Sequence, residues 1–273
     1  MAKGSSRFGK YKERKVREAL RNPINVLKSL SEKSQEKSYK YQRLYRNLYN
    51  PEFYLLAYQN IYANKGSMTP GVDGMTIDGI SMARINRIIE SMRNQSYQPK
   101  PARREYIKKK TGNKKRPLGI SSADDKLVQE VVRMILESIY EGSFSVKSHG
   151  FRPNKSCHTA LIQIRKTFTG AKWFVEGDIK ACFDSFDHAV LICILRKRIE
   201  DEAFLNLICK FLKAGYMEQW TFNKTYFGIP QGSGCSPILA NIYLNELDEF
   251  MQELKDKFDV GDCNRRKVSY EYE

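Results

Sequence analysis

The sequence has few cysteines, and none of them stands in a metal-binding or disulfide-rich pattern. Six cysteines are spread singly through 273 residues without a Cys-x-x-Cys pair, so the sequence predicts neither a zinc site nor a disulfide framework. No apolar run approaches the ~18 residues of a membrane-spanning helix. Residues 1–15 are basic and lack the apolar core of a signal peptide. We therefore expect a cytoplasmic protein with reduced thiols.

Acidic residues are outnumbered by basic ones. The chain has 31 Asp and Glu against 47 Lys and Arg, which gives a net charge of +16. Such an excess favours a polyanionic partner, and nucleic acid fits best, although a generally basic protein without such a partner stays open on charge alone. Hydrophobic residues make up 41% and aromatic residues 12%, enough apolar surface to form a core, so wholesale disorder is excluded.

Apolar spacing predicts a mixed helical and stranded chain without an internal repeat. After a basic arm, helices are predicted around residues 39–49, 85–92, 127–139, 160–168, 190–195, 204–212 and 236–251. Ser122 or Asp124 is expected to cap the third of these. Hairpins are predicted over residues 104–120 and 218–225, the second turning near Asn223 and Lys224. Residues 173–175 are predicted to form a buried strand.

Three segments carry the chemical signal. Residues 174–188 read FVEGDIKACFDSFDH and bring Asp178 to the end of the predicted buried strand. A carboxylate there has a rigid backbone and faces an open cleft, which suits it to hold a divalent cation for phosphoryl transfer. Residues 228–237 read GIPQGSGCSP, a small-residue turn before a helix. Residues 107–120 are predicted to form a strongly basic hairpin, for which a solvated tip without a ligand stays open as an alternative.

These segments resemble the first catalytic motif, the Pro-Gln-Gly segment and the fingers hairpin of reverse transcriptases of the group II intron type. Residues 149–156 (HGFRPNKS) and 71–74 (GVDG) also resemble family segments, so the similarity covers roughly residues 39–254. The resemblance implies an α+β fold, a right-hand polymerase with fingers and a palm built on an antiparallel sheet flanked by helices. It divides the chain into a basic amino-terminal extension (1–50), fingers (51–170) and palm (171–273).

The resemblance also implies roles for single residues. Asp178 would be catalytic and would bind metal, two Mg²⁺ ions in the complete enzyme, together with the main-chain carbonyl of Ile179. Phe183 would pack against the sugar of the incoming nucleotide and exclude a 2′-hydroxyl, with Gln231 beside the same pocket. Lys110 and Arg116 would contact the triphosphate. The implied contacts to template or RNA are Ile120, Arg152, Gly232 and Gly71.

The sequence departs from the family at the second catalytic aspartate motif. Family members carry a Tyr-x-Asp-Asp turn after the Pro-Gln-Gly segment, and this sequence has none. The similar residues Ala123 to Asp125 precede the first motif, so we expect them to cap a helix. Asp184 and Asp187 are likewise expected to be structural. We infer a palm truncated before that motif, a fragment that is inactive alone, and an exposed apolar palm surface that favours a homodimer.

The function implied is RNA-directed DNA polymerase activity that copies intron RNA, combined with intron RNA binding as a splicing maturase. The partners would be group II intron RNA, an RNA template with a DNA primer, and deoxynucleoside triphosphates. Two alternatives stay open: a maturase module that binds RNA without catalysis, and a reverse transcriptase of the retron or diversity-generating type. Asp178, Phe183 and Gln231 favour catalysis, because RNA binding alone needs none of them.

Overall fold

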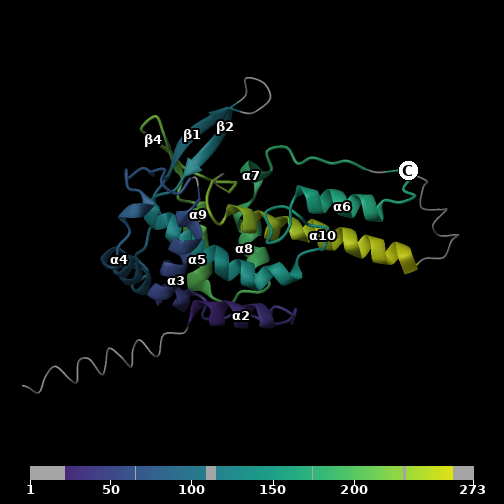
Figure 1. The fold of residues 1–273 in the computed structure, drawn as a ribbon, viewed down its shortest axis with the longest axis horizontal. Helices are drawn as coiled ribbons and strands as arrows, with labels where there is room; N and C mark the ends of the chain where they lie inside the picture. Colours follow the sequence, from purple (N-terminus) through teal and green to yellow (C-terminus); the bar gives the residue numbers. More distant parts are fainter. Residues whose placement is uncertain (1–21, 65, 109–114, 174, 230–231, 261–273) are drawn as a thin grey trace, which may run out of the picture.

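The chain folds into a helical body with a small sheet at one edge (Figure 1). This computed structural model describes residues 22–64, 66–108, 115–173, 175–229 and 232–260. The α-helices are α2 (Pro23–Lys33), α3 (Pro51–Tyr62), α4 (Met82–Arg93), α5 (Ala123–Tyr140), α6 (Cys157–Thr167), α7 (Cys182–Ser185), α8 (His188–Arg196), α9 (Glu202–Leu212) and α10 (Ser236–Val260). Short 3-10 helices are η1 (Tyr45–Tyr49), η2 (Ile77–Gly79) and η3 (Glu141–Ser143). The fold is therefore α+β, as predicted.

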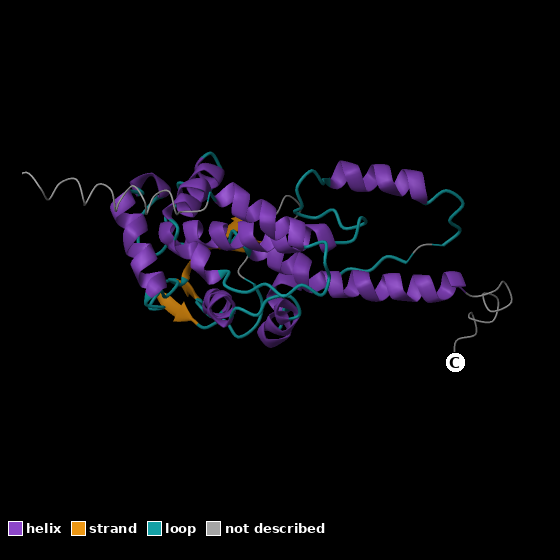
Figure 2. Ribbon diagram, turned by 90° about the horizontal axis from the view of Figure 1, so that it is seen from below, coloured by secondary structure: helices purple, strands orange, loops and turns teal. Residues whose placement is uncertain are grey.

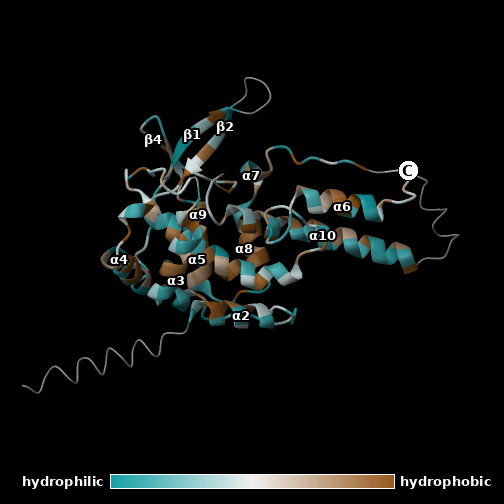
Figure 3. Cartoon of the chain, in the orientation of Figure 1, coloured by the Kyte–Doolittle hydropathy of each residue, from teal (hydrophilic) through white to brown (hydrophobic). Residues whose placement is uncertain are grey.

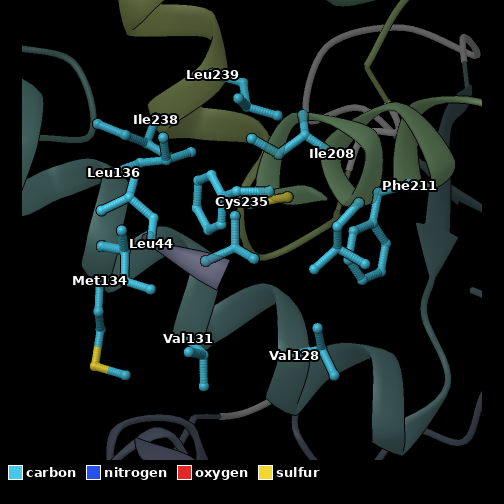
Figure 4. Close-up of a cluster of buried hydrophobic side chains, with 14 of the residues drawn as sticks. Leu44, Val128, Val131, Met134, Leu136, Ile208, Phe211, Cys235, Ile238 and Leu239 are labelled. Carbon is cyan, nitrogen blue, oxygen red and sulfur yellow. The ribbon is translucent and has the colours of Figure 1, made fainter. Parts of the chain in front are cut away.

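Helix α5 runs through the centre of the core. Its side chains pack against α2, α3 and α10. Figure 4 shows side chains of α5, such as Val128 and Val131, in one buried cluster with Ile208 and Phe211 of α9 and Leu239 of α10. Each fully buried side chain of this size contributes about 1.5–3 kcal/mol of transfer free energy. The helix is thus the element on which both halves of the chain are assembled.

The sheet joins segments that are far apart in the sequence. Its order is β2-β1-β3-β4, with β1 (Ala102–Lys108), β2 (Lys115–Ile120), β3 (Tyr216–Glu218) and β4 (Thr221–Asn223). The pairs β1–β2 and β3–β4 are antiparallel, whereas β1 and β3 are parallel, with Ala102 opposite Tyr216. Seen from below in Figure 2, the strands lie at the opposite end of the molecule from α6. The basic hairpin is thereby fixed to a second hairpin more than a hundred residues later.

Most of the predicted helices are confirmed, as is the capping of α5. The amide of Asp125 donates to Ser122 Oγ at 3.2 Å, so Ser122 is the cap. The Asp125 carboxylate accepts from the Tyr97 hydroxyl at 2.6 Å, and Asp124 pairs with Arg84 at 2.5 Å. Both aspartates therefore serve the fold, as expected, although their side chains bond to neighbours and Ser122 supplies the cap.

The buried strand predicted over residues 173–175 is wrong. Trp173 is 91% exposed and Val175 is 99% exposed, and no strand is formed anywhere in the described part of residues 168–181. Phe174 lies outside the described residues. An extended segment becomes a strand only when its N–H and C=O groups find partners on a neighbouring strand. Among the described residues no strand runs beside this segment, so Asp178 lies in irregular chain.

Two further local predictions are corrected. Residues 39–49 form only η1 in place of a long helix, because Arg43 has a left-handed φ of 55° and the chain cannot continue as a helix through it. The second hairpin turns at Gln219 and Trp220, which have φ of 48° and 65°, whereas Asn223 is paired in β4. The tyrosine spacing near residue 45 reflects packing onto the core rather than one helical face.

Helix α6 and the far half of α10 extend away from the body at the end opposite the sheet (Figures 1 and 2). Helix α6 has no buried residue, and Phe250 and Met251 of α10 are more than half exposed. Brown apolar residues are accordingly visible on α6 in Figure 3. Exposed apolar side chains thus lie on both helices, while the apolar palm surface and the homodimer stay predictions. None of the helices that the structure describes combines the length and apolarity needed to cross a bilayer.

Candidate active site

One open cleft brings four of the predicted site residues together. It has a volume of about 860 Å³ and is lined by Arg116 of β2, Asp178, Phe183 of α7 and Gly232. The four come from three separate segments of the sequence, the three that carry the chemical signal. The cleft is therefore the candidate active site, and it lies between the basic hairpin and the start of α10.

Residues 183–186, which follow Asp178, are joined by backbone hydrogen bonds to residues 228–229, which precede Gly232. The amide of Ile229 donates to the carbonyl of Phe183, and the amide of Gly228 donates to the carbonyl of Phe186, both at 2.7 Å. The buried ring of His188 adds a bond from Nε2 to the Gly228 carbonyl at 2.7 Å. The sequence did not identify His188 as a supporting residue. The feature that could have identified it is a polar residue at the start of an apolar helix.

Glycine is required at two points where these segments meet. Gly228 has a φ of 85°, and a Cβ there would lie 2.8 Å from the Phe183 carbonyl oxygen. Gly232 has a φ of 104°, and its Cβ would lie 2.6 Å from the carbonyl oxygen of Gly119 in the basic hairpin. Only glycine adopts such angles readily and leaves room for this approach. The hairpin and the loop before α10 thus form one continuous wall.

Gln129 of α5 hydrogen-bonds to the loop before α10, a contact that the sequence did not predict. Its Oε1 accepts a hydrogen bond of 3.1 Å from the amide of Gly234, and the side chain is buried. Gln129 occupies the same helical face as Val132 and Leu136, which are fully buried. A polar residue in an apolar stripe was the signal that could have identified it, because buried polar groups must find partners.

The Phe183 ring is held by the neighbouring ring of Phe186. It makes an edge contact with Phe186 at 6.1 Å between centroids, and Phe186 packs on Tyr243 of α10 at 4.5 Å. Such edge and tilted arrangements are favourable for aromatic pairs. The ring is half-buried, so one part is fixed by the core and the rest is open to the cleft. This arrangement suits a residue that must present a rigid apolar surface to a ligand.

Asp178 and Asp184 bring carboxylates to the cleft. Both are exposed, and both belong to its lining. Cys182 between them has its pKa raised by burial and by the negative charge of Asp178, so the thiol stays protonated. No cluster of three or more His, Cys, Asp or Glu side chains occurs in the described ranges. Mg²⁺ is commonly bound through one or two carboxylates plus waters and substrate phosphates, so these hard oxygen donors fit it.

Three of the remaining predicted residues, Ile120, Gly71 and Arg152, do not line this cleft. Ile120 is buried at the end of β2, and Gly71 packs where a Cβ would lie 2.7 Å from Ser122 Cα. Arg152 points inward, where it pairs with Glu141 at 2.9 Å and donates to the Ser145 carbonyl at 2.6 Å. The roles of these three in binding template or RNA stay predictions. Lys110 and Gln231 lie outside the described residues.

Asp187 has the structural role that was expected, and Asp184 does not. The Asp187 carboxylate accepts from the amides of Ala189 and Val190 at 2.7 and 3.0 Å, which caps α8. Asp184 instead faces the cleft. The two aspartates, three residues apart, therefore differ in what they contact, and only one of them is free to meet a ligand.

Comparison with known proteins finds matches to reverse transcriptases and to intron-encoded proteins. Residues 107–265 match the family described as "Reverse transcriptase (RNA-dependent DNA polymerase)". The chain is 54% identical over 252 residues to "Group II intron-encoded protein LtrA" of Lactococcus lactis subsp. cremoris, covering 92% of this chain and 42% of that protein. It is 46% identical to an "Uncharacterized 91 kDa protein in cob intron" of Schizosaccharomyces pombe, covering 91% of this chain and 31% of that protein. The chain thus spans less than half the length of these two relatives.

A solved structure supports the same fold. The chain superimposes on a chain of the "Partial Cas6-RT-Cas1--Cas2 complex" with a TM-score of 0.52 and 22% identity. The match covers 77% of this chain and 35% of the other. At this identity the likeness speaks for the fold alone.

Proposed function

We propose, since this chain belongs to the reverse transcriptase (RNA-dependent DNA polymerase) family, that it carries the nucleotide-addition site of an RNA-directed DNA polymerase encoded by a group II intron. The observation that carries the proposal is the cleft in which Asp178, Phe183, Arg116 and Gly232 converge. A carboxylate that can hold a metal ion and a cation that can contact phosphate are groups that phosphoryl transfer uses. A fixed aromatic ring beside them can pack against the sugar of the nucleotide. The reaction would join a primer hydroxyl to a deoxynucleoside triphosphate.

Asp178 and the main-chain carbonyl of Ile179 would hold Mg²⁺, which supplies charge neutralisation at the triphosphate and lowers the pKa of the primer hydroxyl. Asp184 lies on the same cleft and is available as a further oxygen ligand. The residues of this chain would orient the reactants. Because Asp178 is exposed and in irregular chain, its carboxylate can turn towards a cation that arrives with substrate.

Arg116 would bind the triphosphate, with Lys110 as a second cation on the same hairpin. An arginine makes paired, charge-assisted hydrogen bonds to phosphate oxygens. Phe183 would contact the sugar and exclude a 2′-hydroxyl, and Gln231 would lie beside the nucleotide. The edge contact of Phe183 with Phe186 supports this role, because a side chain that excludes a 2′-hydroxyl must keep its position when a ribonucleotide enters.

Intron RNA binding is the second part of the proposal. The net charge of +16 and the names of the relatives, which are intron-encoded, support a group II intron RNA as partner and a maturase role in splicing. An RNA template with a DNA primer would occupy the cleft. The division into extension, fingers and palm belongs to the proposal too, and its boundary at residue 170 falls in the irregular chain between α6 and α7.

The test is primer extension on an RNA template by a fusion of this chain to the part of the Lactococcus relative that lies outside the matched region. We expect Mg²⁺-dependent incorporation of deoxynucleotides, and none with this chain alone. A fusion that folds and binds the template and primer but incorporates no nucleotide would contradict the polymerase assignment. Retained binding of intron RNA in that case would favour a maturase without catalysis.

A further inference from the structure

We propose that the β3–β4 hairpin and the pocket at its base bind unpaired nucleotides of a single nucleic-acid strand. The proposal rests on the proposed function, because the pocket adjoins the candidate active site. Pro117 and Asp184 line both the pocket and the cleft. The pocket and the cleft therefore share a wall.

The pocket combines aromatic rings with cations. It has a volume of about 370 Å³, inside the range of ~300–1,000 Å³ typical of small-molecule sites. Its walls include Arg104, Tyr216, Lys224, Tyr226 and Phe227. The Arg104 guanidinium lies 3.4 Å from the centre of the Tyr216 ring, which holds it flat against the wall. Tyr226 and Phe227 are 71% and 61% exposed, so their rings are open to a ligand.

The tip of the hairpin presents a further ring. Trp220 is 96% exposed, and Phe222 in the following strand is 48% exposed. Gln219 and Trp220 both have left-handed φ angles, 48° and 65°, in a two-residue turn that usually takes Asn-Gly. Trp220 thus takes an unfavourable backbone conformation although its side chain makes no contact with the core. An aromatic ring held out in this way is suited to stack on a flat partner.

The charges favour a polyanion. Arg104 and Lys224 are the cations of the pocket, and Asp184 is its one acid, on the wall shared with the cleft. The nearby Glu218 carboxylate accepts a hydrogen bond of 2.5 Å from the Tyr106 hydroxyl, so it is directed at the sheet. Aromatic rings beside cations are the usual means of binding single strands, because every base has a face that stacks and every phosphate carries charge.

The same chemistry disfavours a duplex. The faces of paired bases are covered by their neighbours, whereas unpaired bases can be splayed out and stacked on protein rings. Rings at the tip and at the base of the hairpin would stack on different bases of one strand, with Arg104 and Lys224 near its phosphates. The ligand is accordingly an unpaired segment of RNA or DNA. Only RNA carries a 2′-hydroxyl, so an RNA and a DNA oligonucleotide can be compared to distinguish the two.

The test uses the fluorescence of Trp220. The chain has two tryptophans, Trp173 and Trp220, so Trp173→Phe leaves Trp220 as the sole reporter. The probe is a single-stranded oligouridylate of about 12 nucleotides, within the ~4–16 nucleotides that single-strand sites cover. We expect quenching that saturates with oligouridylate, and little with a duplex RNA at the same phosphate concentration. An oligothymidylate arm compares RNA with DNA.

Variants test the rings and the cation separately, with affinity measured by the anisotropy of labelled oligouridylate. Trp220→Ala is expected to weaken binding about 5- to 160-fold, the effect of losing one stacked base. Arg104→Gln is expected to weaken binding and to flatten its salt dependence. The matched control is Trp173→Ala, which removes an equally exposed tryptophan, 91% against 96%, away from the hairpin. We expect affinity within twofold of the wild-type chain for this control.

Two outcomes would overturn the proposal. Affinity of Trp220→Ala equal to that of the wild-type chain would remove the stacking platform. If the wild-type chain self-associates and Trp220→Ala does not, with oligouridylate binding unchanged, the hairpin contacts protein instead. Neither measurement needs nucleotide addition, so a fusion that fails to extend a primer would leave this result standing, and the two proposals can fail independently.

Discussion

The amide of Ile229 donates a hydrogen bond of 2.7 Å to the carbonyl of Phe183, and this bond sets the distance between the two segments that line the cleft. Because both groups are backbone, side-chain substitution cannot remove the bond directly. Its geometry depends instead on Gly228, whose left-handed φ of 85° turns the chain towards Phe183. The position of the proposed sugar gate thus depends on a glycine that does not line the cleft.

Gly228→Ala should therefore destabilise the fold and displace Phe183. A Cβ would meet the Phe183 carbonyl oxygen at 2.8 Å, in a backbone conformation that alanine adopts poorly, and we expect a loss of about 1–3 kcal/mol in the free energy of unfolding. Urea unfolding measures it. Gly66→Ala is the control, since no atom lies within 4 Å of a Cβ there. Equal effects of the two substitutions would contradict the steric argument.

Asp178→Asn should slow primer extension by the fusion protein while leaving its fold and RNA affinity intact. A neutral amide binds Mg²⁺ poorly, and we expect a loss of about 100-fold or more in rate. Asp187→Asn is the matched control, because asparagine caps a helix as well as aspartate does. Near-normal extension by Asp178→Asn would show that the metal is held by another residue.

Phe183→Ala should relax the choice of sugar. Removal of the ring opens space beside the sugar, so we expect ribonucleotide incorporation to rise about 10-fold or more relative to deoxynucleotides, with a smaller loss of deoxynucleotide incorporation. The ratio of kcat/KM for the two nucleotides measures it. Phe183→Tyr retains the ring and should retain discrimination. An unchanged ratio in Phe183→Ala would mean that another group is the gate.

RNA binding by this chain should weaken steeply with salt. The excess of Lys and Arg displaces condensed counterions from phosphates, and we expect affinity to fall about 10-fold or more between 50 and 200 mM salt. Equilibrium binding of a structured RNA across a salt series gives the slope. An affinity independent of salt would show that the charge of the chain does not drive binding.

Alkali should destabilise the chain through its buried tyrosines. Burial raises the pKa of the Tyr45 hydroxyl to about 12, and the charges of Tyr49 and Asp201 add to the shift. Because this pKa lies above the ordinary value of about 10, the stabilisation is complete below pH 10 and is lost as the pH rises towards 12. Unfolding of wild type and Tyr45→Phe at pH 8 and at pH 11 measures the difference.

Tyr45→Phe should lose less stability than the wild-type chain between these two pH values, since phenylalanine has no proton to release. At pH 8 it should be about 1 kcal/mol less stable, because the hydroxyl donates to the Met92 carbonyl at 3.2 Å. Tyr62→Phe is the control, as the Tyr62 side chain is 53% exposed. An alkaline loss in Tyr45→Phe as large as in the wild-type chain would exclude Tyr45 as a source of the effect.

Helices were predictable because their pattern is local. The stripe of Ile85, Ile88, Ile89 and Met92 is buried in α4, and Ser122 caps α5, as spacing and residue type indicated. The grouping of Asp178, Phe183, Arg116 and Gly232 was implied by resemblance and needed no knowledge of the turns between them. Helical spacing, caps and complete motifs can thus be predicted from the sequence where the chain between them serves only as a connection.

The failures concern structure that depends on distant partners. Residues 173–175 are apolar enough for a strand, but a strand forms only beside another, and a local pattern cannot report whether that neighbour is present. The turn at Gln219 and Trp220 was missed because neither residue favours left-handed angles. The supporting roles of Gln129 and His188 were missed because each acts through a backbone group far along the chain.

The exposed segment between α6 and α7 has a consequence for how the polypeptide can be divided. The buried cluster takes residues such as Leu127 and Ile135 from before this segment and Leu195 and Phe204 from after it. A chain cut between Ala171 and Lys180 would therefore yield two pieces that each lack half of one interior. Neither piece could bury its apolar side chains alone, so the pieces should reassemble when mixed. The molecule thus offers a natural position for a split protein, whose halves would rebuild the cleft only when both are present.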